Sequence, residues 1–164
     1  MNSGYKLKGE LTLTVKDASG KIKDSRHITN KIVMTGCNMI ASALSGEIAR
    51  NESTMIGIPT HIACGDGMAI PTVNDVALEH ELARVPFDIN PKRDGNSVTF
   101  QATFGPGVPN ADNTTMTEVG IFNAETNGTM LNRATFAVVN KSVDDTVIIN
   151  WVVTVLSDSG NTAE

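Results

Sequence analysis

Aromatic residues are scarce in this chain of 164 residues: one Trp, one Tyr and five Phe make up 4% of it. Proteins that hold single-stranded nucleic acid commonly stack its bases on aromatic side chains, so such a platform is not expected here. Positive charge is also in deficit, because 13 Lys and Arg stand against 18 Asp and Glu, which gives a net charge of −5. A cationic field for phosphate backbones is therefore missing, and nucleic acid is not a predicted partner.

Cysteines and long apolar runs are few as well. Cys37 and Cys64 are too few for the disulfide scaffold of a small secreted domain. Both lie among apolar residues, so we expect buried free thiols, with a single disulfide as the alternative. No run of residues is long and apolar enough to span a membrane, and the N-terminus lacks the apolar stretch of a signal peptide. We expect a soluble protein with no membrane partner, made in a reducing cytosol.

The clearest pattern in the chain is an alternation of apolar and polar residues over residues 5–15, which predicts a strand with one wet face. A turn over residues 17–20 leads to a second, more polar strand over residues 21–28. We expect a hairpin arm, residues 1–28, which gains stability by packing because a lone hairpin is marginal in water. Its apolar row should contact the chain's own sheets or a neighbouring subunit or particle; the row comprises Leu7, Leu11, Leu13 and Val15.

Two changes of pattern in the first half predict short helices. Thr35 can cap a helix over residues 36–45, and Asn74 or Asp75 can cap a second helix that reaches Ala83. From there the chain reads as strands and turns. The last strand is apolar on both faces, which predicts a central strand covered on both sides. The predicted strands of the module comprise residues 58–64, 85–89, 97–104, 115–122, 129–139 and 147–156.

These elements predict a mainly β fold: an antiparallel β-sandwich of about seven to nine strands, with two short helices in the first half and the N-terminal β-hairpin arm. The length suits one domain. We expect the arm at residues 1–28, the sandwich module at residues 29–157 and a disordered tail at residues 158–164.

Side chains that could carry chemistry are few and poorly spaced. His27, His61 and His80 are far apart in the sequence, and His61 and Cys64 are three residues apart on a predicted strand, so they face opposite sides. Gly65-Asp-Gly67 resembles part of a phosphate or calcium loop, but the Lys-Ser/Thr pair and the spaced carboxylates of such loops are missing. We expect no metal, no cofactor and a tight turn at this place.

Carboxylates give no better sign of an enzyme. Glu79, Glu81 and Glu118 could imitate a glycosidase pair, but the aromatic platforms of a sugar cleft are lacking. Glu118 still needs a partner, because it lies in an apolar strand and an unpaired buried carboxylate is costly. We predict a structural ion pair between Glu118 and Arg84, with Arg133 as the second choice, that fixes the register and has no catalytic role. The chain is expected not to be an enzyme.

Three segments, taken together and in order, resemble the N-terminal module of the tail-collar fibre proteins of tailed bacteriophages and small free-standing virion proteins that share it. Each segment alone is weak, but their combination is fairly specific, and the resemblance covers residues 30–156. The segments are residues 30–44 (NKIVMTGCNMIASAL); residues 58–67 (IPTHIACGDG) followed by 71–72 (PT) and 77–84 (ALEHELAR); and residues 117–124 (TEVGIFNA) with 128–131 (GTML).

The resemblance implies a non-enzymatic virion protein whose module docks on the particle. This sequence departs from the family pattern by its N-terminal hairpin and by the lack of a fibre shaft after the module. We therefore expect a small adaptor or fibre-attachment protein of the tail, collar or neck, made in the host bacterial cytoplasm and built into the virion. Other virion proteins are its expected partners, in a homo-oligomer for which the resemblance favours a trimer. A head decoration (cement) protein that stabilises the capsid is the first alternative, and a soluble ligand-binding β-sandwich the second.

Overall fold

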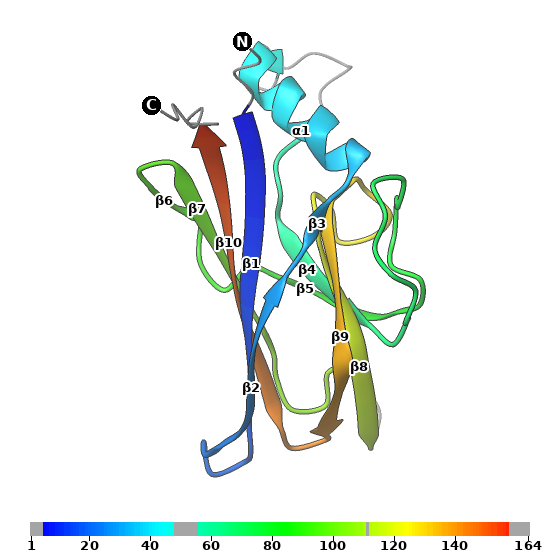
Figure 1. Ribbon diagram of the computed structural model, residues 1–164. Helices are drawn as coiled ribbons and strands as arrows, with labels where there is room; N and C mark the ends of the chain where they lie inside the picture. The colour runs from blue at the N-terminus through cyan, green and yellow to red at the C-terminus, as the bar shows by residue number, and fades with distance from the viewer. Residues whose placement is uncertain (1–4, 48–55, 111, 158–164) are drawn as a thin grey trace, which may run out of the picture.

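The computed structural model describes residues 5–47, 56–110 and 112–157. They form a mainly β structure with two antiparallel five-stranded sheets and one helix (Figure 1). Within these residues there are ten strands, where seven to nine were expected, and one helix, where two were expected. The elements are β1 (Tyr5–Lys16), β2 (Ile22–Thr29), β3 (Lys31–Ile32), α1 (Met34–Ser45), β4 (His61–Gly65), β5 (Glu81–Pro86), β6 (Lys92–Asp94), β7 (Ser97–Phe104), β8 (Asn113–Phe122), β9 (Met130–Ser142) and β10 (Thr146–Ser157).

The first sheet has the strand order β2-β1-β10-β7-β6. The expected hairpin is present in it: Asp17 accepts hydrogen bonds from the backbone N–H groups of Ser19 and Lys21, at 2.9 and 3.0 Å. Gly20 completes the turn with a φ of 83°, a conformation that favours glycine. The hairpin is not an arm, however, because β1 lies between β2 and β10 and pairs with β10 over twelve residue pairs. The expected boundary after residue 28 is corrected accordingly.

The apolar row of β1 explains this position. Leu11, Leu13 and Val15 are fully buried in the chain's own core, where they meet residues of both sheets. The first alternative, packing on the chain's own sheets, is therefore confirmed for these three side chains, and their assignment as contacts to a neighbouring subunit or particle is wrong. Leu7, at the beginning of the row, is only half-buried.

The second sheet has the order β3-β9-β8-β4-β5, and its strands also pair antiparallel. The main core lies between the two sheets and includes Ile62 of β4 and Ile121 of β8 together with Trp151 of β10. A smaller apolar cluster lies on the other face of the second sheet, the face turned away from the first sheet. It comprises Val33, Ala63, Leu78, Phe122 and Met130.

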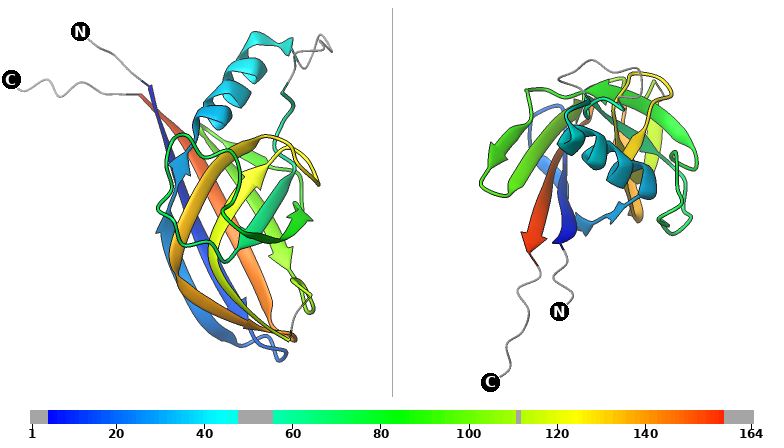
Figure 2. Two further views of the ribbon diagram at one scale, coloured as in Figure 1. Left: turned by 90° about the vertical axis from the view of Figure 1, so that its right-hand side faces the viewer. Right: turned by 90° about the horizontal axis from the view of Figure 1, so that it is seen from above.

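Helix α1 crosses one end of the two sheets (Figures 1 and 2). It begins two residues before the predicted start and ends at the predicted residue, Ser45. Gly36 allows it to pack tightly on the second sheet, since a Cβ at this position would come within 2.0 Å of the Leu131 carbonyl oxygen. Gly46 ends the helix with a φ of 77°.

The predicted second helix, from Asn74 or Asp75 to Ala83, is wrong. Residues 66–80 form a loop, and the chain then enters β5, which pairs with β4 over five residue pairs. The local sequence Leu-Glu-His-Glu-Leu-Ala has good helix formers, but pairing with the edge of the second sheet overrides that weak preference.

Strand β10 is central, as expected, but only one of its faces is covered. Ile149 and Trp151 are fully buried, whereas Val152 on the other face is half-buried and Leu156 is exposed. The predicted tail at residues 158–164 lies outside the described residues.

Candidate functional site: a loop anchored to the second sheet

Residues 66–80, which we call the anchored loop, join β4 to β5 and pass over the outer face of the second sheet (Figure 2, left). All of them are described, and none belongs to a helix or strand. Asp75 organises the middle of the loop: Thr72 donates to its carboxylate from the backbone N–H and from the hydroxyl, at 3.1 and 2.7 Å. A segment without regular structure must find other partners for its backbone groups, and much of this loop finds them on the sheet.

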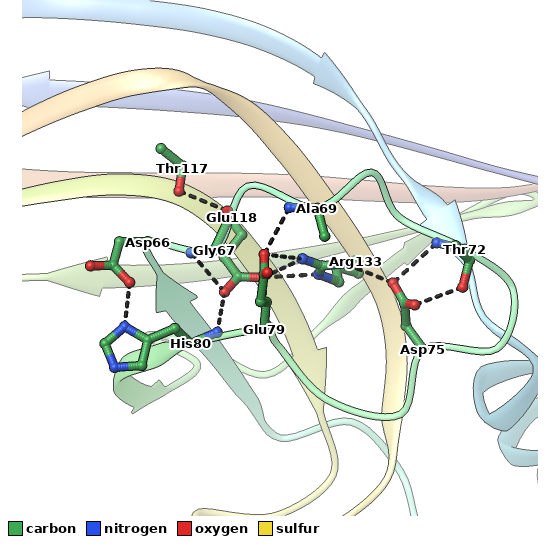
Figure 3. A network of polar contacts seen from close by, with 10 residues as sticks. All are labelled: Asp66, Gly67, Ala69, Thr72, Asp75, Glu79, His80, Thr117, Glu118 and Arg133. Carbon is green, nitrogen blue, oxygen red and sulfur yellow. Dashed lines mark hydrogen bonds and ion pairs between the residues drawn. The ribbon is translucent and has the colours of Figure 1, made fainter.

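Those partners converge on Glu118 of β8, which is fully buried (Figure 3). Its Oε1 atom accepts hydrogen bonds from the backbone N–H groups of Gly67 and His80, at 3.1 and 2.8 Å. Its Oε2 atom accepts one from the backbone N–H of Glu79, at 3.1 Å. The neighbouring Thr117 hydroxyl donates to the Gly67 carbonyl, at 2.8 Å. A single carboxylate thus ties both ends of the anchored loop to the sheet.

The pairing of β8 with β9 is irregular beside Glu118, where three residues of β9 (136–138) lie opposite Thr117 alone. The pairing of β8 with β9 shifts between Met116 and Glu118. Met116 and Val119 both belong to the main core although they are three residues apart, which regular alternation would not allow. The regular alternation of β8 is therefore interrupted here, and Glu118 faces the anchored loop instead of the core, as is common where strand pairing is irregular near functional sites.

Arg133 of β9 provides the opposite charge and is also buried. Its Nε and Nη2 atoms lie 2.9 and 2.8 Å from Glu118 Oε2, and its Nη1 donates to Asp75 at 2.8 Å. Burial works to lower the pKa of Arg133, but the carboxylates of Asp75 and Glu118 outweigh it and raise that pKa. The pKa of Asp75 is lowered, because hydrogen bonds from Thr72 and Arg133 outweigh the opposing effect of burial. The guanidinium therefore holds the middle of the anchored loop while Glu118 holds its ends.

Two glycines make room for this network. A Cβ at Gly65 would lie 2.3 Å from the His80 carbonyl oxygen and 2.6 Å from Glu118 Oε1. A Cβ at Gly67 would lie 2.4 Å from the Glu79 Cβ and 2.5 Å from the same Glu118 oxygen. Such contacts are far below van der Waals distance, so any side chain at either position would displace the carboxylate or the loop. The Gly65-Asp-Gly67 segment is thus not a tight turn but the end of β4 and the beginning of the anchored loop, and it is part of the network.

At the rim of the network, the side chain of Asp66 contacts His80 Nδ1 (Figure 3). The Asp66 backbone N–H also donates to the His80 carbonyl, at 3.2 Å. The hydrogen bond and the negative charge of Asp66 raise the pKa of His80. Both side chains are exposed to solvent, so this pair is a weaker fastening than the buried one.

The second choice for the partner of Glu118, Arg133, is the one that the structure has, and the first choice, Arg84, is wrong. Arg84 instead forms a two-pronged contact with Glu81, at 2.9 and 2.7 Å, and lies over the Phe122 ring at 3.7 Å from its centroid. The reason lies in the strand order. Arg133 is on β9, next to β8, whereas Arg84 is on β5, two strands away from β8.

The other residues singled out in the sequence do not join the network. His61 accepts or donates a hydrogen bond with the Thr60 hydroxyl at 2.7 Å, and burial lowers its pKa. Both cysteines are free, but only Cys64 is buried, which raises the pKa of its thiol to about 12; Cys37 is exposed on α1, contrary to expectation. Within the described ranges, no three His, Cys, Asp or Glu side chains form a group that could hold a metal ion. His27 lies 3.5 Å from Glu10 on the first sheet.

While its base is fixed by charge, the anchored loop turns large apolar side chains to solvent. This exposure is unusual, because large apolar side chains are mostly buried. Here, buried hydrogen bonds hold the loop that carries them outside the core, and exposed apolar patches of this kind commonly mark contact sites. The exposed residues are Met68, at 75% exposure, Ile70, at 83%, Val73, at 47%, and Val76, at 65%.

Asp75 and the backbone donors at Gly67, Glu79 and His80 are the parts of the network that the sequence did not reveal. Backbone N–H groups carry no sequence signal, so their role could not be predicted. Asp75 was assigned to a helix cap, which was the right type of residue for a turn but the wrong element. One sequence signal points to the site. Glu118 lies in an apolar strand, and the glycines of a distant segment, Gly65 and Gly67, leave room for its carboxylate.

No family model matches this chain, and neither the curated proteins nor the solved structures compared with it gave a match. In the part of the chain that the structure describes, no helix is both long and apolar enough to cross a membrane.

Proposed function

We propose that the chain is a non-enzymatic structural component of a tailed bacteriophage virion: a small β-sandwich adaptor of the tail, collar or neck, to which a fibre or another virion protein attaches. It is made in the host cytoplasm and works as a homo-oligomer, with a trimer favoured by the family resemblance. Residue placement and contacts in the anchored loop support the proposal.

One observation is the main support for this proposal. Two of the three sequence segments behind the resemblance, the second and the third, supply residues that meet at Glu118. Gly67 comes from the second segment, as do the N–H groups of Glu79 and His80, and Glu118 itself comes from the third. Arg133 follows the third segment by two residues. The shared residues therefore serve a common mechanical task, which is to hold one loop on one sheet.

The chemistry of this network supports attachment and not catalysis. Each oxygen of Glu118 faces backbone donors or the Arg133 guanidinium, so the carboxylate has no free side for a substrate. A buried ion pair of this kind contributes specificity of structure more than net stability. In an adaptor, such specificity keeps the attachment loop in a single shape before its partner arrives, which lowers the entropy cost of binding.

The proposal is tested on particles of the phage that encodes the chain. We expect peptides of the chain to remain with purified particles at a fixed stoichiometry after a salt wash, and we expect an electron-microscopy reconstruction to locate it at the tail, collar or neck. Density on the capsid surface would instead identify a head decoration protein. Particles without the chain, together with a purified protein whose melting temperature rises on adding a ligand, would favour a soluble ligand-binding β-sandwich.

A further inference from the structure

Two apolar surfaces of the chain lie on different parts of the molecule. The first is the anchored loop on the outer face of the second sheet, with Ile70 as its most exposed large apolar side chain. The second is a recess of about 190 Å³ where α1 crosses the end of the sheets. We call it the apolar recess, because every described residue that lines it is apolar or a glycine. Its walls include Leu7, Met39, Ile40, Leu131, Val153 and Val155.

The apolar recess has the size and openness to receive a side chain. Ile58 and Val155 line it and are 57% and 44% exposed, so the recess is open to solvent. A dry apolar cavity of roughly 150 Å³ can hold a benzene ring, so the recess has room for one large aliphatic side chain. Exposed apolar concavities of this kind commonly mark contact sites.

The anchored loop has matching properties. It exposes four large apolar side chains, Met68 and Ile70 among them, and its backbone is already fixed by Glu118 and Arg133. Little conformational entropy is therefore lost when the loop docks. The loop is thus a preformed projection, whereas the recess is a preformed hollow.

Charge at the two surfaces is complementary. Arg93 of β6 is exposed and pairs across the strands with Val98, a wall of the apolar recess, so it lies at the rim on the same face. The base of the anchored loop carries the exposed carboxylate of Glu79 and the partly exposed carboxylate of Asp66. A cation at the hollow and carboxylates at the projection favour one orientation of contact between two copies of the chain.

We propose that the anchored loop of one copy docks in the apolar recess of the next copy, with Ile70 entering the recess and Arg93 facing the acidic base of the loop. Because the two surfaces differ, the contact is heterologous, and a trimer requires that its repetition close into a ring of three copies. The inference rests on the proposed function, because it names one partner of the anchored loop: a second copy of the chain.

Cysteine cross-linking tests the contact directly. In a Cys37→Ser background, Ile70→Cys and Val155→Cys are prepared as separate proteins with tags of different size, and each is checked for an unchanged melting temperature. We expect mild oxidation of the mixture to give a disulfide-linked pair that contains both tags. Val138→Cys, an exposed residue of β9, replaces Val155→Cys as the matched control and should give no mixed pair.

Other outcomes overturn the proposal. If Ile70→Cys links only to itself, the copies meet loop to loop; if no linked pair forms and sedimentation gives a monomer, the loop does not bind a second copy. Arg93→Glu provides an independent reading: it should weaken self-association about tenfold or more, whereas Lys92→Glu, on the opposite face of the same strand, should change it little. Equal effects of the two variants count against the proposed rim contact. A monomer that still co-purifies with particles would refute this inference and the proposed homo-oligomer, and would leave the proposed role as a virion adaptor intact.

Discussion

The outer faces of the two sheets differ sharply although both sheets share one core. On the first sheet, the strands turn polar side chains such as Lys8, Thr99 and Asn150 to solvent. On the second sheet, the anchored loop covers a fully buried Glu118 and a buried Arg133. This difference identifies the outer face of the second sheet as the specialised part of the chain. Hydrophobic burial between the sheets maintains the fold, whereas the buried charge of Glu118 and Arg133 holds a loop in one shape.

Removal of residues 1–28 should have the largest effect, because it takes an inner strand from the first sheet. The deletion exposes β10 along its length and removes three fully buried side chains from the core. We expect a chain without cooperative unfolding, as measured by circular dichroism. A truncated chain that melts cooperatively would mean that the second sheet and the loop are a separate unit. Leu13→Ala is the milder version and should cost about 2–5 kcal/mol of unfolding free energy.

Glu118→Gln should have the next largest effect, and it should act on the second sheet. The amide keeps the shape, but its NH₂ group would face N–H donors, and Arg133 would lose a buried counter-charge. We expect a loss on the order of 3 kcal/mol in urea unfolding. The matched control is Glu10→Gln, which weakens the exposed pair with Lys8 and should lower the unfolding free energy far less. Equal losses in the two variants would contradict the distinction between a buried and a surface pair.

Sequence reasoning reached the fold class and the existence of the Glu118 pair because both leave local signals. Alternation located the strands of the second half closely; β7, residues 97–104, matches its prediction at both ends. The partner of Glu118 depends instead on strand order, which places Arg133 beside it and Arg84 two strands away. Strand pairing also explains why the predicted helix that ends at Ala83 is absent: its last residues belong to β5, and the rest lies in the anchored loop. Pairing between distant segments outweighed local helix preference, and the sequence alone contains no measure of that pairing.

Gly67→Ala should have a smaller effect that is confined to the loop. The new methyl group would overlap the Glu79 Cβ and the Glu118 carboxylate, so the network must shift to admit it. We expect a loss of about 1–3 kcal/mol, the range for overpacking in a well-packed site. Gly105→Ala is the control, because nothing lies within 4 Å of a Cβ there and its φ is not in the left-handed region. The melting temperatures of both variants test this prediction. An unchanged melting temperature of Gly67→Ala would refute the tight fit.

The pH dependence of loop protection should be smaller still. The pKa of Asp75 is lowered from its ordinary value of 3.8, so its contribution is present above that pH and is lost as the pH falls through the lowered value. The pKa of His80 is raised above its ordinary 6.5, so its contribution is complete below pH 6.5 and is lost as the pH rises through the raised value. Proteolysis within residues 66–80 should therefore be slowest between these limits. His80→Asn should abolish the alkaline change alone; a wild-type profile without one would show that the Asp66 contact contributes nothing.

Thiol labelling should perturb the chain least and can report on the second sheet. Cys37 is exposed on α1 and should react with a thiol reagent in the native protein, whereas Cys64 is buried in β4 with a pKa raised to about 12. We expect one equivalent to react in the folded chain and two in denaturant. Two fast equivalents in the folded chain would indicate that the second sheet opens readily.

The exchange rate of three backbone amides tests the central claim, that buried charge holds the anchored loop, most directly. The N–H groups of Gly67, Glu79 and His80 donate to Glu118 although they belong to a loop. In hydrogen–deuterium exchange followed by NMR, we predict that they exchange about as slowly as the amides of β8 in the wild type. In Glu118→Gln they should exchange at least about tenfold faster, while the amides of β1 and β10 keep their order of protection. Fast exchange of all three in the wild type would contradict the account, because the loop would then not be anchored by Glu118.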